Sequence, residues 1–124
     1  MVKRIVIPVS EERGLDSKLS EHFGRAPYFA AVELEKDGKV SSLNFVSNVS
    51  EHFGGVGTPP DRILQLKPNA VITYGMGPRA LNIFQGVKVA VLRANADTVR
   101  EVTLAYSNDK LEELTEGCHE ALHH

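Results

Sequence analysis

The length, composition and charge of the chain describe one ordinary globular domain and exclude several classes of protein. Its 124 residues are 42% hydrophobic and 24% charged, which is typical of a folded domain and argues against disorder. Because 14 Lys and Arg stand against 16 Asp and Glu, no basic surface is indicated and we expect no nucleic-acid partner. The longest apolar runs fall far short of the roughly 20 residues that a membrane-spanning helix needs.

The single cysteine and the N-terminus indicate the compartment. One Cys cannot form an intrachain disulfide, which suits a reducing environment. The N-terminus MVKRIVIPVSEER meets charged residues too early for a secretory signal. We therefore expect a soluble cytoplasmic protein with one domain over residues 1–124 and a flexible tail over about 115–124.

Three strands are predicted in the first part of the chain. Val2–Val9 is rich in β-branched residues and almost continuously hydrophobic, as in a central strand covered on both faces. Tyr28–Leu34 and Val40–Val46 flank an Asp37-Gly38 pair. Asp-Gly is a strong hairpin signal because both residues tolerate positive φ. We therefore expect these two strands to pair antiparallel.

Two loops interrupt this first part. Ser10–Ala26 is polar and rich in turn residues, although the spacing of its apolar residues could support a short helix through Leu15, Leu19 and Phe23. The second loop contains the only glycine cluster of the chain, at positions 54, 55 and 57. Prolines and an aspartate follow it, and these residues favour a helix over about Pro60–Leu66.

The second part of the chain alternates strands with helices. Ala70–Tyr74 is predicted as a buried strand, and the segment GMGPRALNIFQ as a turn and a helix. Val87–Leu92 is the next predicted strand. Asp97 and Thr98 then open a helix that runs to about Tyr106, and Asp109–His119 could hold one more helical piece that ends near Gly117.

This order of elements predicts the fold class. Strands that alternate with helices run parallel through right-handed crossovers, whereas the first three strands can form an antiparallel meander. The expected fold is therefore α/β. It is a ribonuclease-H-like three-layer arrangement, in which a mixed five-stranded sheet carries helices on both faces.

Nuclease chemistry is not expected, although this topology suggests it. Two-metal phosphoryl transfer requires several converging carboxylates. Neither Val2–Val9 nor Ala70–Tyr74 carries a carboxylate. No Ser-His-Asp or Cys-His dyad is indicated either, so we expect a protein that is not an enzyme.

The candidate metal ligands gather in the two loops and the tail. His22 and His52 each lie within a copy of SEHFG, whereas Cys118 and His119 lie in the tail with the terminal histidine pair. Imidazole and thiolate are ligands that zinc, copper and iron–sulfur species accept. A plain surface role for the loop histidines and a packing role for Cys118 stay open. The spacing does not match a closed structural zinc site.

The turn over Gly75–Ala80 is a competing signal. It follows a strand, opens a helix and matches G-x-G-x-x-A, the dinucleotide-binding pattern. However, Pro78 removes one N–H from the turn, and no acidic residue ends the strand that follows. The turn favours a nucleotide- or anion-sensing module, or a protein-interaction module, as the alternative function. Its glycines could also serve only to pack the helix close to the sheet.

Two segments of the chain resemble the dinitrogenase iron–molybdenum cofactor biosynthesis family. They are SEHFGRAPYF at Ser20–Phe29 and VITYGMGPRALNIFQGVKVAV at Val71–Val91. The matching features are HFGRA-x-x-F after the first strand, the G-x-G-P-x-A turn and the G-V-K-V strand. The resemblance covers about Lys3 to Leu114 and implies a ribonuclease-H-like fold without nuclease activity.

The resemblance also implies a function and its residues. It implies binding or carriage of an iron–sulfur or iron–molybdenum type cluster during cofactor assembly, with His22 as the candidate cluster contact. Small members of the family carry His or Cys in the second loop and near the C-terminus, which here are His52 and Cys118 with His119. The chain differs in having no cysteine in the second loop. Arg25 could offset the negative charge of the cluster.

We therefore expect a non-catalytic metallocluster carrier. His22 and Cys118 would bind the metal, and Arg25, His52 and His119 would complete the binding site. The expected partners are the proteins that donate and accept the cluster. We expect a monomer or a weak homodimer, in which a second copy could supply another thiolate.

Overall fold

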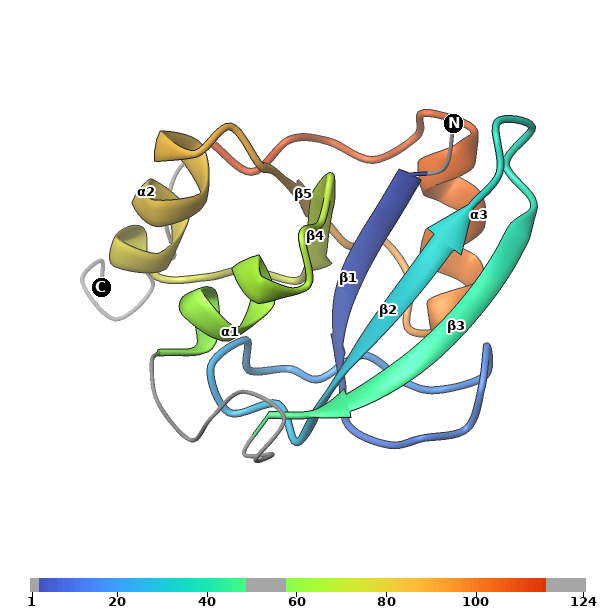
Figure 1. Cartoon of the computed structure of the whole chain (residues 1–124), viewed down its shortest axis with the longest axis horizontal. Coiled ribbons are helices and arrows are strands. Elements are labelled where there is room, and N and C mark those ends of the chain that lie inside the picture. The colour runs from blue at the N-terminus through green and yellow to red at the C-terminus, as the bar shows by residue number, and fades with distance from the viewer. Residues whose placement is uncertain (1–2, 49–57, 116–124) are drawn as a thin grey trace.

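The computed structural model describes residues 3–48 and 58–115, which form a mixed five-stranded sheet with helices on both faces (Figure 1). In chain order the elements are β1 (Lys3–Val9), β2 (Tyr28–Leu34), β3 (Val40–Ser47), α1 (Pro59–Gln65), β4 (Ala70–Thr73), α2 (Pro78–Gly86), β5 (Ala90–Arg93) and α3 (Val99–Ser107). The predicted α/β class and the predicted order of elements are confirmed. None of the helices in these described ranges is long and apolar enough to cross a membrane.

The strands lie in the order β3-β2-β1-β4-β5. β1 pairs antiparallel with β2, and β2 pairs antiparallel with β3. β1 also pairs parallel with β4, and β4 pairs parallel with β5. The mixed sheet expected from the sequence is thus confirmed, whereas its assignment as ribonuclease-H-like stays a prediction.

The hairpin between β2 and β3 turns at the predicted Asp-Gly pair. Gly38 has φ +90°, and its N–H donates to the carbonyl of Glu35 (2.9 Å). The N–H of Lys39 donates to Oδ1 of Asp37 (3.0 Å), so the aspartate closes the turn from the side. The local sequence therefore specifies this turn, and Oγ of Ser107 in α3 adds a hydrogen bond to the carbonyl of Gly38 (3.3 Å).

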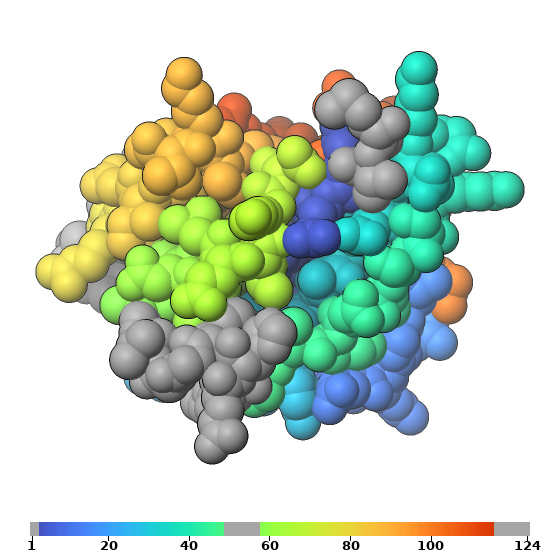
Figure 2. All heavy atoms as spheres, in the orientation of Figure 1, coloured from blue at the N-terminus to red at the C-terminus, as the bar shows by residue number. Residues whose placement is uncertain are grey.

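Two apolar clusters lie on the two faces of the sheet. Ile5 and Ile7 of β1 pack with Val99 and Val102 of α3 on one face. On the other face, Val6 packs in the cluster that contains Ile63 of α1 and Leu81 and Phe84 of α2. Figure 2 shows this second face, where α1 and α2 form the surface on one side and β3 on the other. Burying each Val or Ile side chain contributes about 1.5–3 kcal/mol, so β1 is the centre of the core.

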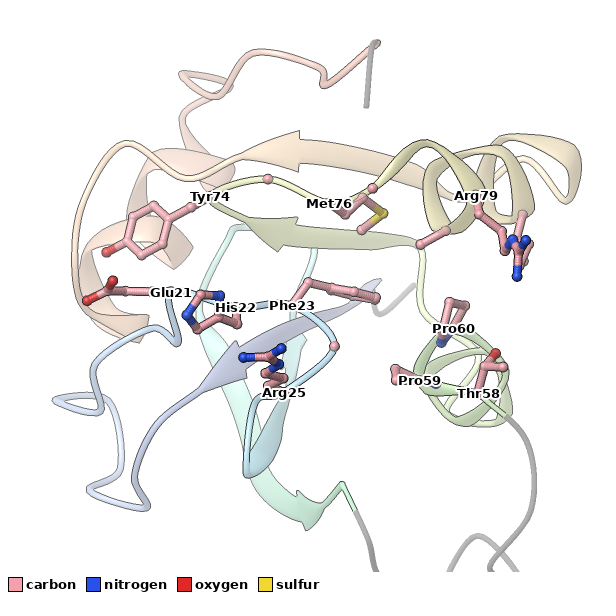
Figure 3. Close-up of a pocket in the computed structure, with 15 residues that line it drawn as sticks. Glu21, His22, Phe23, Arg25, Thr58, Pro59, Pro60, Tyr74, Met76 and Arg79 are labelled. Atoms are coloured by element: carbon pink, nitrogen blue, oxygen red, sulfur yellow. The ribbon is translucent and has the colours of Figure 1, made fainter. Parts of the chain in front are cut away.

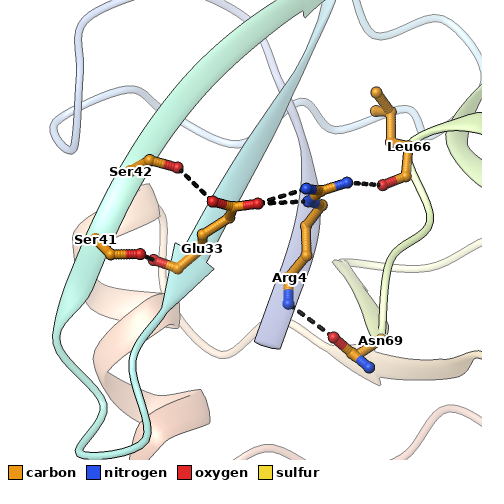
Figure 4. A network of polar contacts seen from close by, with 6 residues as sticks. All are labelled: Arg4, Glu33, Ser41, Ser42, Leu66 and Asn69. Atoms are coloured by element: carbon orange, nitrogen blue, oxygen red, sulfur yellow. Dashed lines mark hydrogen bonds and ion pairs between the residues drawn. The ribbon is translucent and has the colours of Figure 1, made fainter. Parts of the chain in front are cut away.

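A polar network crosses the first three strands at the amino end of β1 (Figure 4). The Arg4 guanidinium donates to the Glu33 carboxylate and to the carbonyl of Leu66. Glu33 also accepts a hydrogen bond from Oγ of Ser42 (3.1 Å). The bond from Arg4, followed by that from Ser42, holds the pKa of Glu33 below its usual value. This network ties the sheet together at the end opposite the candidate site described below.

Two further helices that the sequence left possible do not form in the described residues. The loop Ser10–Ala26 contains no helix, because Leu19 packs in the cluster on the α3 face and Phe23 packs in the cluster on the opposite face. A helix would place residues with four-residue spacing on one face. Instead the N–H of Leu19 donates to the carbonyl of Asp97 (2.9 Å), which joins the loop to the segment before α3.

The helical piece that Asp109–His119 could hold is also absent over residues 109–115, the part of this range that the structure describes. There the chain runs beside β5. The N–H of Arg93 donates to the carbonyl of Glu112 (2.8 Å), and the N–H of Leu114 donates to the carbonyl of Val91 (2.7 Å). This contact satisfies main-chain groups at the edge of the sheet and buries Leu114.

Candidate functional site

A cavity of about 730 Å³ opens at the carboxyl ends of β1 and β4 (Figure 3). Its walls come from residues 21–25 in the loop after β1, residues 58–60 at the start of α1, and residues 74–80 at the start of α2. β1 and β4 are parallel neighbours, but the chain continues from β1 to β2 and from β4 through α2 to β5, in opposite directions. Such a divergence leaves a crevice at the end of a sheet, which is a usual place for a ligand.

Local contacts fix the backbone around His22. The N–H of His22 donates to Oγ of Ser20 (3.2 Å), and that hydroxyl donates to the carbonyl of His22 (3.0 Å). The next residue, Phe23, is buried with its ring edge-on to Phe84 of α2, at a centroid distance of 6.1 Å and an angle of 87°. Buried Phe23 thus anchors the loop to the core, whereas His22 is exposed at the cavity.

Asn48 joins the same loop to α1. Its buried carboxamide donates from Nδ2 to the carbonyls of Gly24 (3.3 Å) and Ala26 (2.8 Å). Its Oδ1 accepts a hydrogen bond from Nη1 of Arg62 in α1 (2.9 Å). A single side chain at the end of β3 therefore positions two of the three walls of the cavity.

The start of α1 matches its prediction closely. Thr58 donates hydrogen bonds from its N–H (3.1 Å) and its hydroxyl (3.0 Å) to the carboxylate of Asp61. These two bonds keep the pKa of Asp61 below its usual value. Pro59 and Pro60 occupy the first turn, where a missing N–H costs little, and together with Thr58 they face the cavity.

The polar groups of the cavity differ between its two ends. Arg25 and Arg79 are exposed cationic side chains on its walls, and in Figure 3 Arg79 lies at the end remote from Glu21 and Tyr74. The Tyr74 hydroxyl donates to Oδ1 of Asp97 (2.7 Å). Burial, this bond and the nearby carboxylates raise the pKa of Tyr74 to about 12. In Figure 3, Arg25 lies nearer to His22 than to Arg79. The cavity wall at each arginine is thus suited to an anion, and the tyrosine hydroxyl with its carboxylate neighbours is not.

Part of the cavity surface is apolar and contains one sulfur atom. Phe23 and Met76 are both buried and belong to the same apolar cluster, and both line the cavity beside Pro59 and Pro60. The Met76 thioether is a soft, polarizable group. The cavity therefore combines cationic, imidazole and thioether groups, which together suit a soft anion better than a hard one.

The structure brings together the two signals that competed in the sequence. His22 and Arg25 line one wall, and the Gly75–Ala80 turn lines another wall of the same cavity. The other predicted site residues, His52, Cys118 and His119, lie outside the described residues. Within the described ranges, no group of three or more His, Cys, Asp or Glu side chains could bind a metal ion.

Four residues that shape this cavity are not predicted as site residues from the sequence. Tyr74, Met76 and Arg79 line it, and Asn48 positions its loop. Met76 and Arg79 lie inside the G-x-G-P-x-A turn, at the positions where the pattern accepts any residue. Asn48 gave no signal, because its partners are 14 to 24 residues away along the chain.

Comparisons with known proteins identify the family and agree with the fold. The dinitrogenase iron–molybdenum cofactor family matches residues 3–109. An uncharacterized protein of Methanocaldococcus jannaschii, MJ0580, is 30% identical over 111 residues, which is 88% of this chain and 89% of that protein. The crystal structure of PH0822 is 30% identical with a TM-score of 0.72, over 90% of this chain and 96% of that one. The NMR structure of TM1290 from Thermotoga is 29% identical with a TM-score of 0.70, over 95% and 98% of the two chains.

Proposed function

We propose that this chain, which belongs to the dinitrogenase iron–molybdenum cofactor family, binds an iron–sulfur or iron–molybdenum type cluster as its cargo and carries it during cofactor assembly. The observation that supports this most directly is the cavity of about 730 Å³ with His22, Arg25 and Arg79 on its walls. Metal–sulfide clusters are anionic, with sulfides on their surface, so these groups match the charge of the cargo.

Each side chain has a distinct role in this proposal. His22 binds an exposed iron through an imidazole nitrogen. Arg25 and Arg79 offset the negative charge of the cluster and donate hydrogen bonds to its sulfides, which are known to tune such clusters. Cys118, His52 and His119 are proposed from the sequence to add further ligands. A small number of protein ligands is suited to a carrier, because a carrier must release the cluster that it binds.

The role that we propose for this protein is that of a carrier and not of an enzyme. Its partners are a protein that donates the cluster and a protein that accepts it. His22, Arg25 and Arg79 are all exposed, so a partner could reach a bound cluster without unfolding the site.

The test is an anaerobic titration of the apo-protein with a synthetic [4Fe–4S] cluster, followed by gel filtration with absorbance and iron analysis. Iron should elute with the wild-type protein and less of it with His22→Ala and with Cys118→Ala. Arg79→Gln should weaken binding by about 1–2 kcal/mol, roughly 5- to 30-fold in Kd. The matched control is Arg100→Gln, which removes an exposed guanidinium that pairs with Asp16 and does not line the cavity.

Two results would contradict the proposal. One is the absence of iron from the wild-type protein peak, and the other is equal iron in the wild-type, His22→Ala and Arg79→Gln proteins. The alternative function, nucleotide or anion sensing through the Gly75–Ala80 turn, is favoured by the position of that turn on the cavity wall. It would be supported if a nucleotide raised the melting temperature of a protein that binds no cluster.

A further inference from the structure

On the basis of the proposed function, we infer that the bound cluster lies directly against the main chain at Gly75 and Gly77, and that these positions are glycine so that its sulfides can approach. This would give the cavity a specificity-determining contact that the main chain itself makes. Both glycines line the cavity, on the strand-to-helix segment that also carries Met76 and Arg79.

The protein itself does not require glycine at these two positions. A glycine is needed where φ is positive, where another part of the protein packs too close for a Cβ, or where a ligand does so. The positive-φ glycines among the described residues are Gly14 and Gly38, and Gly77 has φ −66°. A Cβ at Gly75 or Gly77 would meet no atom within 4 Å.

Gly38 shows what a structurally required glycine looks like in this chain. Its φ is +90°, and a Cβ there would lie 3.1 Å from the Cβ of Ser107. Neither condition applies to Gly75 or Gly77. The sequence also allowed a packing role, in which these glycines let α2 lie close to the sheet. The empty space around each of them argues against this role. Open space alone does not mark a ligand contact, because Gly86 has it too. Gly75 and Gly77 differ from Gly86 in lining the cavity, where a ligand can approach the main chain.

Gly77 has a second role in the protein, as a helix cap, and Gly75 does not. Gly77 is the residue that caps the amino end of α2, and glycine is better than alanine as a helix cap. Gly75 precedes the helix and caps nothing. Gly75 is therefore the sharper test, and Gly77 is best replaced by serine, which caps well and still adds a Cβ.

The chemistry of this wall fits a sulfide surface. The N–H groups of Met76 and Gly77 make no hydrogen bond to another main-chain group in the described part of the chain. A main-chain N–H donates more strongly to a charged acceptor than to a neutral one, and hydrogen bonds to cluster sulfurs are a recognised way for a protein to tune a cluster. A Cβ at either position would keep a large, rigid cluster away from these donors.

The experiment measures stability and binding of the same variants. Gly75→Ala should melt at the wild-type temperature or about 2–4 °C above it, because alanine restricts the unfolded chain. The same protein, and Gly77→Ser, should bind the synthetic [4Fe–4S] cluster about tenfold or more weakly. Gly86→Ala is the matched control: its Cβ also meets no atom, but Gly86 lies at the end of α2 and does not line the cavity. It should gain stability without losing the cluster.

The possible outcomes separate this inference from the proposed function. If the wild-type protein binds no cluster, both are overturned. If the wild-type protein binds and Gly75→Ala binds as tightly as Gly86→Ala, the proposed function stands and the inference is wrong. A Gly75→Ala protein that melts well below the wild type would also overturn it, since the new Cβ would then meet a protein neighbour.

Discussion

Asn48 offers a direct test of how the candidate site is built, and we predict that Asn48→Ala destabilises the protein by about 2–4 kcal/mol. Its buried carboxamide makes three hydrogen bonds, to the carbonyls of Gly24 and Ala26 and from the guanidinium of Arg62. Each such bond contributes about 0.5–1.5 kcal/mol net. For a domain of 124 residues, the total corresponds to a loss of about 8–15 °C in melting temperature.

The assay combines urea unfolding with hydrogen exchange. Amides of the loop at residues 22–26 should exchange faster in Asn48→Ala, because this loop loses its link to α1. The matched control is Asn44→Ala on β3, where the side chain is exposed, and its stability should stay within about 0.5 kcal/mol of the wild type. If Asn48→Ala were no less stable than Asn44→Ala, the carboxamide would not be what holds the loop.

Two further predictions concern the aromatic residues around the cavity. Tyr74 has a pKa of about 12 in the folded protein and about 10 when unfolded, so it contributes a loss of stability as the pH rises from 10 to 12. Tyr74→Phe should therefore flatten the fall in unfolding free energy measured by urea between pH 10 and 12, and an unchanged slope would contradict the raised pKa of Tyr74. Replacing Phe23 and Phe84 by leucine, singly and together, should give a coupling energy of about 0.5–1.5 kcal/mol in urea unfolding, whereas strictly additive effects would mean that their edge-on contact contributes nothing.

The elements that could be predicted from the sequence are those that local patterns determine. The Asp37-Gly38 turn forms through its own backbone and side chain, and β1 lies buried at the centre of the sheet as its continuous hydrophobicity indicated. The start of α1 likewise depends on residues within one turn of each other. In each case the physical cause is present in the sequence within a few residues.

The errors arise where distant contacts decide the structure. The predicted strand Val87–Leu92 begins only at Ala90 in the structure, because Lys88 adopts φ +63° and Val87 is 54% exposed at the end of α2. The strand starts where Ala90 can pair with Ala70 of β4. In the same way, the apolar residues of Ser10–Ala26 suggested a helix, but the two faces of the sheet need them separately.

The candidate site was predictable only in part for the same reason. His22 and Arg25 were singled out through their motif, but the cavity exists because β1 lies beside β4, about sixty residues further along the chain. No local pattern specifies this pairing. Arg79 and Met76 become part of the same site as His22 only once the pairing has formed.

The proposed carrier role explains why the walls of the cavity differ in character. The arginines are exposed, so their attraction for an anionic cargo acts at a distance and is weakened by salt. The glycine and methionine wall acts only at contact, and salt screens such contacts little. Capture of a cluster would then depend on the charge of the arginines, whereas its retention would depend also on the contact wall. A carrier must first collect a cluster and later release it. A partner that removes the cluster from the glycine and methionine wall need not remove the arginine charges that first attracted it.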